Sequence, residues 1–301
     1  MKNQIKDNNV INLNITKIEI MKLLGILVIT LIFDVLVHQI AKLIREDNML
    51  TLEIIQSKLL LIILDLSGIF ISVIITFICL QKYLMGSRIE KGFKFGIAFG
   101  VFFVYSFFEM CLLWDYSLFE ELINGLADGI PMFFMCILLG LLVGIDTKPA
   151  SEMERMSHSS IQNKIQKISI IGIVYLVGRY IGYICGDLFG TFYSAYLRLP
   201  IETFFWTLSW GLWIGVMYIL LLEQLEERIE SSMRLSLFFG LIFGIPWFIY
   251  TLFIPLIVDP SFFLDAIIRA TVDIISVVIG VYIVQKFNKD SKLIDSDSNQ
   301  S

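Results

Sequence analysis

Nine ionisable residues lie inside the long apolar stretches of this chain, and they are the residues with which it can do chemistry. If those stretches cross a bilayer, each such side chain costs about 3 kcal/mol at the membrane centre and needs a partner, water or a ligand. Six carboxylates, two guanidiniums and one imidazole form a set whose field attracts cations. The nine are Asp34, His38, Asp65, Glu109, Asp128, Arg179, Asp187, Arg269 and Asp273.

Asp34 and His38 are spaced four residues apart, which places them on one face of a helix. A carboxylate and an imidazole within hydrogen-bonding distance can pass a proton between them. One interpretation of the pair is therefore a proton relay. The other is a local polar contact near the membrane surface.

The depth of each ionisable residue follows from the direction in which its helix runs. With the N-terminus in the cytoplasm, Asp34 and Arg179 fall near mid-depth and the other seven fall in the outer half. This distribution predicts an acidic cavity that opens to the outside. The residues expected to bind a solute or an ion there are Asp34, His38, Asp65, Glu109 and Arg179. The residues interpreted instead as hydrated groups close to the interface are Asp128, Asp187, Arg269 and Asp273.

No recognisable catalytic motif accompanies these residues. The chain lacks His-Glu-x-x-His, a glycine-rich phosphate loop, Cys-x-x-Cys and Gly-x-Ser-x-Gly. Its four cysteines, Cys79, Cys111, Cys136 and Cys185, show no paired spacing that would indicate a disulfide framework or a zinc site. The sequence therefore predicts a protein that is not an enzyme, with no catalytic residue, no metal site and no cofactor.

Membrane helices must position these residues, because the composition excludes a soluble domain. The 301 residues are 57% hydrophobic and 17% charged, whereas about a quarter of the residues in a soluble domain are charged. About 20 apolar residues of helix span a bilayer, and eight runs have about that length. An all-α integral membrane protein is predicted, with helix cores at 23–43, 59–80, 95–114, 123–145, 168–189, 204–222, 235–258 and 266–284.

The positive residues of the loops predict the orientation, since Lys and Arg are retained on the cytoplasmic side. If the N-terminus is cytoplasmic, the cytoplasmic segments hold seventeen Lys and Arg residues and the external loops hold four. An even number of spans then puts both termini in the cytoplasm, with the chain in the cell membrane. A net charge of −5 provides no basic surface, so nucleic acid is excluded as a partner.

The chain also matches itself at a distance of 144 residues. Phe95-Gly96 and Phe99-Gly100 fall on Phe239-Gly240 and Phe243-Gly244, and Asp115, Ser117 and Phe119 fall on Asp259, Ser261 and Phe263. A unit with an even number of spans keeps its orientation when duplicated, so the match predicts two parallel four-helix repeats. The alternative is chance recurrence of Phe and Gly, which are abundant in membrane helices.

The repeat predicts an organisation and one long-range contact. The expected segments are a cytoplasmic N-terminal segment (1–19), a first repeat (20–146), a cytoplasmic linker (147–166), a second repeat (167–287) and a polar cytoplasmic tail (288–301). A shift of 145 residues places Asp34 on Arg179, which predicts an ion pair between the repeats. A shift of 147, which matches Gly25 with Gly172, places Ile181 there instead.

These observations favour a permease for a small solute or a cation, with an acidic cavity facing outward. The alternative is a scaffold or accessory subunit that transports nothing and uses its polar residues as interhelical ion pairs. An intramembrane enzyme is a third possibility. The expected partners are the lipid bilayer and a small solute or cation, and the sequence leaves the oligomeric state open.

Overall fold

A computed structural model describes residues 16–44, 52–114, 117–147, 160–188, 195–226, 229, 231–258 and 260–298. Within these residues the fold is helical without strands, and eight helices are long and apolar enough to span a membrane. This confirms the predicted class and the eight spans. The helices are α1 (Lys17–Lys42), α2 (Leu52–Leu80), α3 (Arg88–Trp114), α4 (Leu118–Val143), α6 (Ile161–Leu188), α7 (Pro200–Leu222), α8 (Ser232–Val258) and α9 (Phe263–Ser298), with short 3-10 turns at Glu223–Leu225 and Pro260–Phe262.

The start of α1 illustrates how the sequence sets the helix boundaries. Thr16 accepts a hydrogen bond on its hydroxyl from the Glu19 backbone N–H at 3.3 Å. The Thr16 backbone N–H in turn donates to the Glu19 carboxylate at 2.8 Å. This reciprocal capping box satisfies two backbone donors that a helix N-terminus leaves unpaired. The helix therefore begins at Lys17, in front of the first long apolar run.

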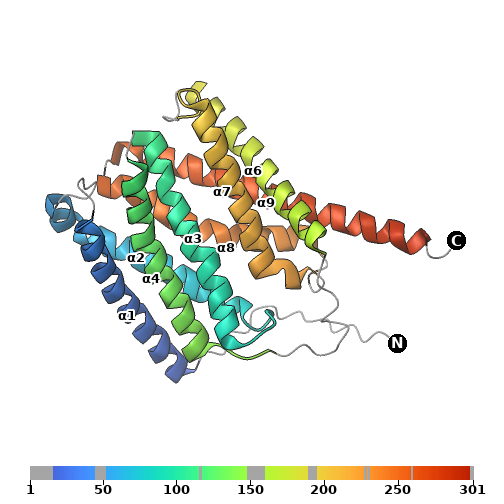
Figure 1. The fold of residues 1–301 in the computed structure, drawn as a ribbon, viewed down its shortest axis with the longest axis horizontal. Helices are drawn as coiled ribbons and strands as arrows, with labels where there is room; N and C mark the ends of the chain where they lie inside the picture. Colours follow the sequence, from blue (N-terminus) through green and yellow to red (C-terminus); the bar gives the residue numbers. More distant parts are fainter. Residues whose placement is uncertain are drawn as a thin grey trace.

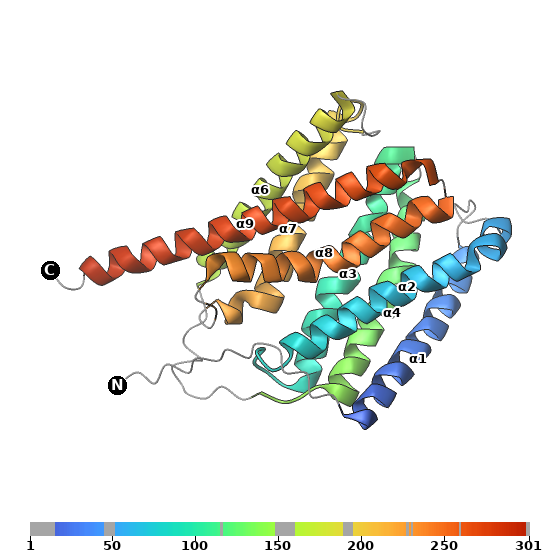
Figure 2. The same ribbon diagram turned by 180° about the vertical axis from the view of Figure 1, so that it is seen from behind.

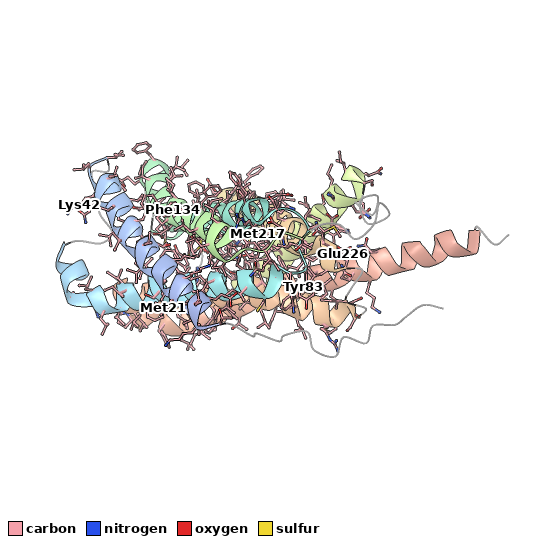
Figure 3. All side chains as sticks on the ribbon, turned by 90° about the horizontal axis from the view of Figure 1, so that it is seen from below. Met21, Lys42, Tyr83, Phe134, Met217 and Glu226 are labelled. Atoms are coloured by element: carbon pink, nitrogen blue, oxygen red, sulfur yellow. The ribbon has the colours of Figure 1, made fainter. Side chains whose placement is uncertain are left out.

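The helices contact one another in a ring, in the order α1, α4, α3, α7, α6, α9, α8, α2 and back to α1. On one side of the ring lie α1, α3, α4, α6 and α7, which face the viewer in Figure 1. On the other side lie α2, α8 and α9, which face the viewer in Figure 2. Figure 3 shows side chains filling the space between these two layers, and α9 extending beyond the other helices.

Glycines bring α3 and α4 into backbone contact. A side-chain carbon placed on Gly92 would lie 2.7 Å from the Cys136 carbonyl oxygen, and one on Gly100 would lie 3.0 Å from the Gly129 carbonyl oxygen. Both approaches are possible only because glycine has no side chain. The glycine face of α3 is therefore used for packing against α4.

The centre of the bundle is aromatic. The Phe102 ring of α3 lies with its centroid 4.9 Å from Trp210 of α7 and 5.8 Å from Trp247 of α8. Such tilted and edge-on pairs add about 0.5–1.5 kcal/mol beyond the burial of their area. Of these three helices, α3 also carries a residue of the polar clusters described below, and α7 and α8 supply tryptophans that contact one of those clusters.

A buried lysine ties the ends of two helices together. Lys91 is fully buried, and its ammonium donates to the carbonyl oxygens of Gln81 at 2.6 Å and Ile145 at 2.9 Å and to the Thr147 hydroxyl at 2.7 Å. These carbonyls follow the last residues of α2 and α4, where a positive charge is favoured by the helix dipole. Lys91 of α3 thus joins the C-terminal ends of α2 and α4 at this end of the bundle.

Some of the predicted segments fall outside the described residues. These are 1–15 of the N-terminal segment, 148–159 of the linker, and Asp115 and Asp259 of the self-match. The predicted polar tail begins within the last helix, because α9 continues to Ser298. No proline interrupts the residues after Val284, although Ser, Asp and Asn outnumber the good helix formers there.

Candidate functional site

Two groups of polar side chains lie between the helices. We call the first the acidic cluster (Asp34, His38 and Asp128) and the second the arginine cluster (Glu109, Arg179, Tyr183 and Asp273). The first joins α1 to α4, and the second joins α3, α6 and α9. Their chemistry differs in the balance of charge.

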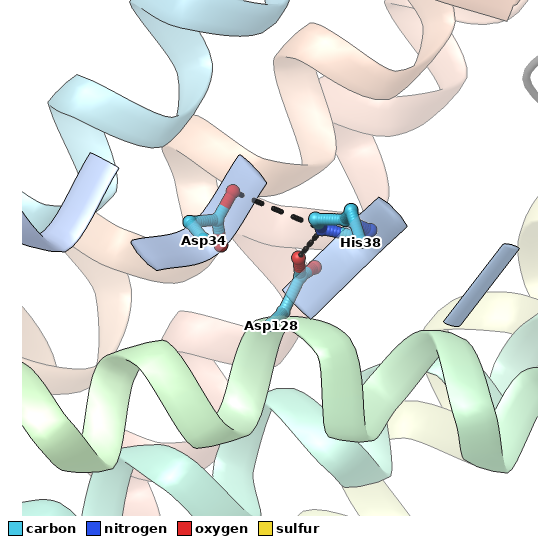
Figure 4. A group of neighbouring side chains, drawn as sticks. All are labelled: Asp34, His38 and Asp128. Carbon is cyan, nitrogen blue, oxygen red and sulfur yellow. Dashed lines mark hydrogen bonds and ion pairs between the residues drawn. The ribbon is translucent and has the colours of Figure 1, made fainter. Parts of the chain in front are cut away.

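His38 is the centre of the acidic cluster. Its Nε2 lies 2.8 Å from Asp128 Oδ1 and 3.8 Å from Asp34 Oδ2, as the dashed lines in Figure 4 mark. The predicted closeness of Asp34 and His38 is therefore confirmed, but the hydrogen bond of His38 goes to Asp128. Asp128 belongs to a helix 90 residues further along the chain, so the contact depends on the packing of α1 against α4.

Asp34 is the deepest member of the acidic cluster. Its side chain is 1% exposed, while those of Asp128 and His38 are 15% and 30% exposed. Neither Asp34 oxygen has a hydrogen-bond partner among the described residues. The same holds for the hydroxyl of Thr30, one turn earlier on α1. A buried carboxylate without hydrogen bonds is costly unless something else neutralises it.

A third carboxylate adds to this charge. Asp65 of α2 is buried, its Oδ1 lacks a hydrogen bond among the described residues, and its charge repels that of Asp128. The ion pairs of the described residues bring no Lys or Arg to Asp34, Asp65 or Asp128. Among the described residues, His38 pairs with Asp34 and Asp128, and the ion pairs give Asp65 no cationic partner.

The arginine cluster is built around one buried guanidinium. Arg179 has no exposed surface, and its Nη2 lies 2.7 Å from Glu109 Oε1 while its Nε lies 2.9 Å from Asp273 Oδ1. Nη2 also donates to the Tyr183 hydroxyl at 2.8 Å. The second oxygen of Asp273 accepts from Tyr183 at 3.3 Å and from Trp247 Nε1 at 3.0 Å.

Aromatic rings cover the same guanidinium. The Tyr183 ring lies 4.5 Å and the Trp206 ring 4.6 Å from the Arg179 Cζ atom, within range of a cation–π attraction. Tyr196, from the segment between α6 and α7, packs its ring 5.1 Å from that of Tyr183. Burial raises the pKa of the Tyr196 phenol, so this ring adds no charge near Arg179. The arginine cluster is thus well packed, and its guanidinium lies between two carboxylates.

A second arginine lies beside this cluster. Arg269 of α9 pairs with Asp265 at 3.0 Å and lies 3.8 Å from Glu109 Oε1. Two guanidiniums therefore face three carboxylates here. Each acid of this group lies within ion-pair distance of an arginine, unlike the acids around His38.

The five predicted binding residues do not form one site. The structure brings Asp34 together with His38, and Glu109 together with Arg179. The predicted ion pair between Asp34 and Arg179 is wrong, because Arg179 pairs with Glu109 and Asp273. Asp273 comes from α9, which packs directly against α6, and Glu109 comes from α3, which packs against α7.

Four residues were interpreted as hydrated groups near the interface, and this is wrong for two of them. Asp273 has no exposed surface, and Arg269 is buried beside Glu109. Asp128 is partly buried and belongs to the acidic cluster, although it was left out of the predicted site. The side chain of Asp187 lies outside the described residues. One available signal was the spacing of Asp128 and Asp273, which at 145 residues equals that of Asp34 and Arg179.

The donor atoms define what each cluster can do. The acidic cluster offers one imidazole nitrogen and carboxylate oxygens, which bind protons and metal cations. The arginine cluster offers a guanidinium whose charge is already matched by carboxylates.

Comparisons of the chain with models of protein families, with curated proteins and with solved structures found no match.

Proposed function

We propose that this protein is a cation permease of the cytoplasmic membrane, in which the acidic cluster binds the transported ion and the arginine cluster is its structural counterpart. The observation that carries the proposal is Asp34, a buried carboxylate that among the described residues has no hydrogen bond and no cationic partner other than His38. A permanently unpaired charge at this depth is destabilising. A bound cation removes that penalty.

The proposal includes two parallel repeats, α1–α4 and α6–α9, and the clusters support it. Asp34, His38 and Asp128 lie 145 residues before Arg179, Tyr183 and Asp273. In each set the first two residues share a helix face and contact each other or the third, at distances between 2.8 and 3.8 Å. Equivalent positions therefore meet in both halves.

The packing of the glycines agrees with this pairing. Gly96 faces Phe133 and Gly100 faces Gly129, and the residues that Gly240 and Gly244 face are Val278 and Ile274. Val278 lies 145 residues after Phe133, and Ile274 lies 145 residues after Gly129. The glycines that face them are 144 residues apart. Such agreement in both sequence spacing and contact is the expected result of a duplicated unit.

The order of the ring agrees as well. Exchanging α1–α4 with α6–α9 converts the contact of α2 with α8 into that of α7 with α3, and both contacts exist. The same exchange converts α1·α4 into α6·α9 and α3·α4 into α8·α9, which also exist. A two-fold axis near the membrane normal accounts for all of these pairs.

The two clusters differ in charge at equivalent positions, and this difference suggests their roles. Arg179 supplies a positive charge in the second half, whereas Asp34 supplies a negative one in the first. Asp273 therefore has a built-in counter-ion at 2.9 Å. In the part of the chain that the structure describes, Asp128 pairs with His38 and with no arginine, so an external cation can supply the missing positive charge.

A polar stripe on α1 offers the route to the site. Thr30, Asp34 and His38 recur every four residues, and His38 is the most exposed of the three. The excess of Lys and Arg in the predicted cytoplasmic loops orients α1 outward. On this orientation an ion from outside meets His38 first, then Asp34.

Uptake into proteoliposomes tests the proposal. The purified chain is reconstituted, and entry of Na⁺, K⁺, Mn²⁺, Zn²⁺ and protons is followed with trapped fluorescent indicators. We expect uptake of at least one cation, and its loss by more than tenfold on Asp34→Asn. The control is Glu202→Gln, which removes an exposed carboxylate from the first turn of α7 and leaves uptake unchanged.

The alternative function is a scaffold that transports nothing. The arginine cluster favours it, because a buried guanidinium that pairs with two carboxylates joins three helices without any ligand. On this alternative, well-folded protein takes up none of the five cations, and both clusters contribute only to stability. The uptake measurement therefore separates the two functions directly.

A further inference from the structure

We infer that the acidic cluster binds a divalent transition-metal ion, one per chain, through Asp34, His38 and Asp128. This names the class of cation for the permease and rests on that proposed function for the meaning of the site. Binding itself is a separate property and can be measured without transport.

The spacing of the ligand atoms is the first argument. One ligand atom from each of Asp34, His38 and Asp128 lies within 4.8 Å of the others. Ligand atoms held about 2.1 Å from a tetrahedral ion are about 3.4 Å apart. The observed distances of 2.8 Å and 3.8 Å from His38 Nε2 lie on either side of that value. Small side-chain movements, with no rearrangement of α1 or α4, are enough to complete the site.

The donor set selects the kind of ion. An imidazole nitrogen suits Zn²⁺, Fe²⁺, Cu²⁺ and Ni²⁺, whereas Na⁺, K⁺ and Mg²⁺ prefer oxygen; Mn²⁺ also prefers oxygen, which the carboxylates supply. Two carboxylates match the double charge of the ion, so the occupied site is electrically neutral. Three protein ligands also leave a coordination position for water, as in zinc sites that exchange ligands.

The surroundings of Asp34 provide a second, independent argument for a bound ion. Asp34 is 1% exposed, points toward His38 (Figure 4), and makes no hydrogen bond with the described residues. Protonation would remove its charge but would add a hydroxyl donor that needs an acceptor. A metal ion at the centre of the cluster satisfies the carboxylate and removes the charge at once.

The second half explains the stoichiometry. At the equivalent place, the Arg179 guanidinium already lies 2.9 Å from Asp273, and Tyr183 stands where the first half has His38. A guanidinium in the position of the ion excludes a metal. One site per chain is therefore expected, although the chain contains two related clusters.

Equilibrium dialysis of the full-length protein in detergent, followed by elemental analysis, tests the inference with Zn²⁺ and Mn²⁺ as probes. We expect one ion per chain, unaffected by a hundredfold excess of Mg²⁺. Asp34→Asn and His38→Gln should each weaken binding at least tenfold, and Glu202→Gln should not change it. Circular dichroism and size-exclusion profiles show whether each variant is folded.

A spectroscopic variant keeps the test decisive if the first two fold poorly. Co²⁺ in the wild-type site should give the visible bands of a nitrogen- and oxygen-ligated ion. His38→Cys should add a thiolate charge-transfer band while retaining one ion per chain, because cysteine is also a metal ligand. That new band would identify position 38 as a ligand.

The outcomes separate the two proposals. Folded wild-type protein that binds no Zn²⁺ or Mn²⁺, or binds them equally after Asp34→Asn and His38→Gln, overturns the metal site. Metal binding without uptake in proteoliposomes supports the site and overturns the permease. Uptake of Na⁺, K⁺ or protons without metal binding overturns the metal site and supports the permease.

Discussion

The Arg179 guanidinium of α6 lies 2.7 Å from the Glu109 carboxylate of α3, and this contact joins helices that are 70 residues apart in the sequence. Removing one partner of a buried pair leaves the other charge uncompensated. We therefore predict that Arg179→Met lowers the free energy of unfolding by about 3–5 kcal/mol. Denaturant titration in mild detergent, followed by tryptophan fluorescence, measures the loss.

The partners of Arg179 supply the control for this prediction. Adding Glu109→Gln and Asp273→Asn to Arg179→Met removes the stranded carboxylates and should restore part of the lost stability. An unchanged unfolding midpoint for Arg179→Met alone would mean that the ion pairs contribute nothing.

Asp34→Asn should raise the free energy of unfolding when no metal is present, in contrast to Arg179→Met. Among the described residues the carboxylate has no hydrogen bond to lose, and its counter-ion His38 lies at 3.8 Å, so the substitution removes a weakly compensated charge and should stabilise the metal-free protein by about 1 kcal/mol. Stability gained at the expense of activity is typical of a binding residue. The measurement is the same unfolding titration with a chelator, and destabilisation by Asp34→Asn would indicate a structural role instead.

Exchanging the residues of one cluster for those of the other tests their equivalence. Asp34→Arg combined with His38→Tyr gives the first half the residue types of the second, with Asp128 in the place of Asp273. We predict a folded protein whose uptake and metal binding are lost, because the new guanidinium pairs with Asp128. A chain that no longer folds would show that positions 34 and 179 have different surroundings.

Packing of α3 against α4 should fail when a methyl group is added between their backbones. At Gly92 the added carbon would lie 2.7 Å from the Cys136 carbonyl oxygen, so Gly92→Ala should destabilise by about 1–3 kcal/mol. Gly25→Ala is the matched control, because nothing lies within 4 Å of a carbon added there. It should be neutral or stabilising by up to about 1 kcal/mol, since Ala is the better helix former. Equal effects at the two positions would contradict the close approach.

Water access can be measured by labelling single cysteines with a membrane-impermeant thiol reagent. In a variant that lacks Cys79, Cys111, Cys136 and Cys185, we predict that His38→Cys reacts from outside and Asp273→Cys does not. The reason is that His38 is 30% exposed whereas Asp273 is fully buried among aromatic and charged neighbours. Labelling of both, or of neither, would mean that the acidic cluster has no special access.

The sequence was sufficient for the membrane class and the number of spans. A bilayer demands about 20 apolar residues per helix, so the run ending at Leu80 and the one beginning near Phe95 could be recognised separately. It was also sufficient to identify the Asp, Glu, Arg and His residues of both clusters as ionisable groups within the apolar stretches, but it did not single out Tyr183. The closeness of Asp34 and His38 followed from the helical repeat alone.

Only the tertiary structure decided which of these residues meet. Asp128 reaches His38 because α1 packs on α4, and Asp273 reaches Arg179 because α6 packs on α9. Neither helix pair consists of neighbours in the chain, and hydrophobic periodicity carries no information about partners when lipid and protein are equally apolar. For the same reason Asp273, placed near the interface from its sequence depth, proved to be buried. The sequence determined which charged residues lie in the apolar helices. The packing of the helices determined that Arg179 lies between two carboxylates and that Asp34, among the described residues, has His38 as its ion-pair partner.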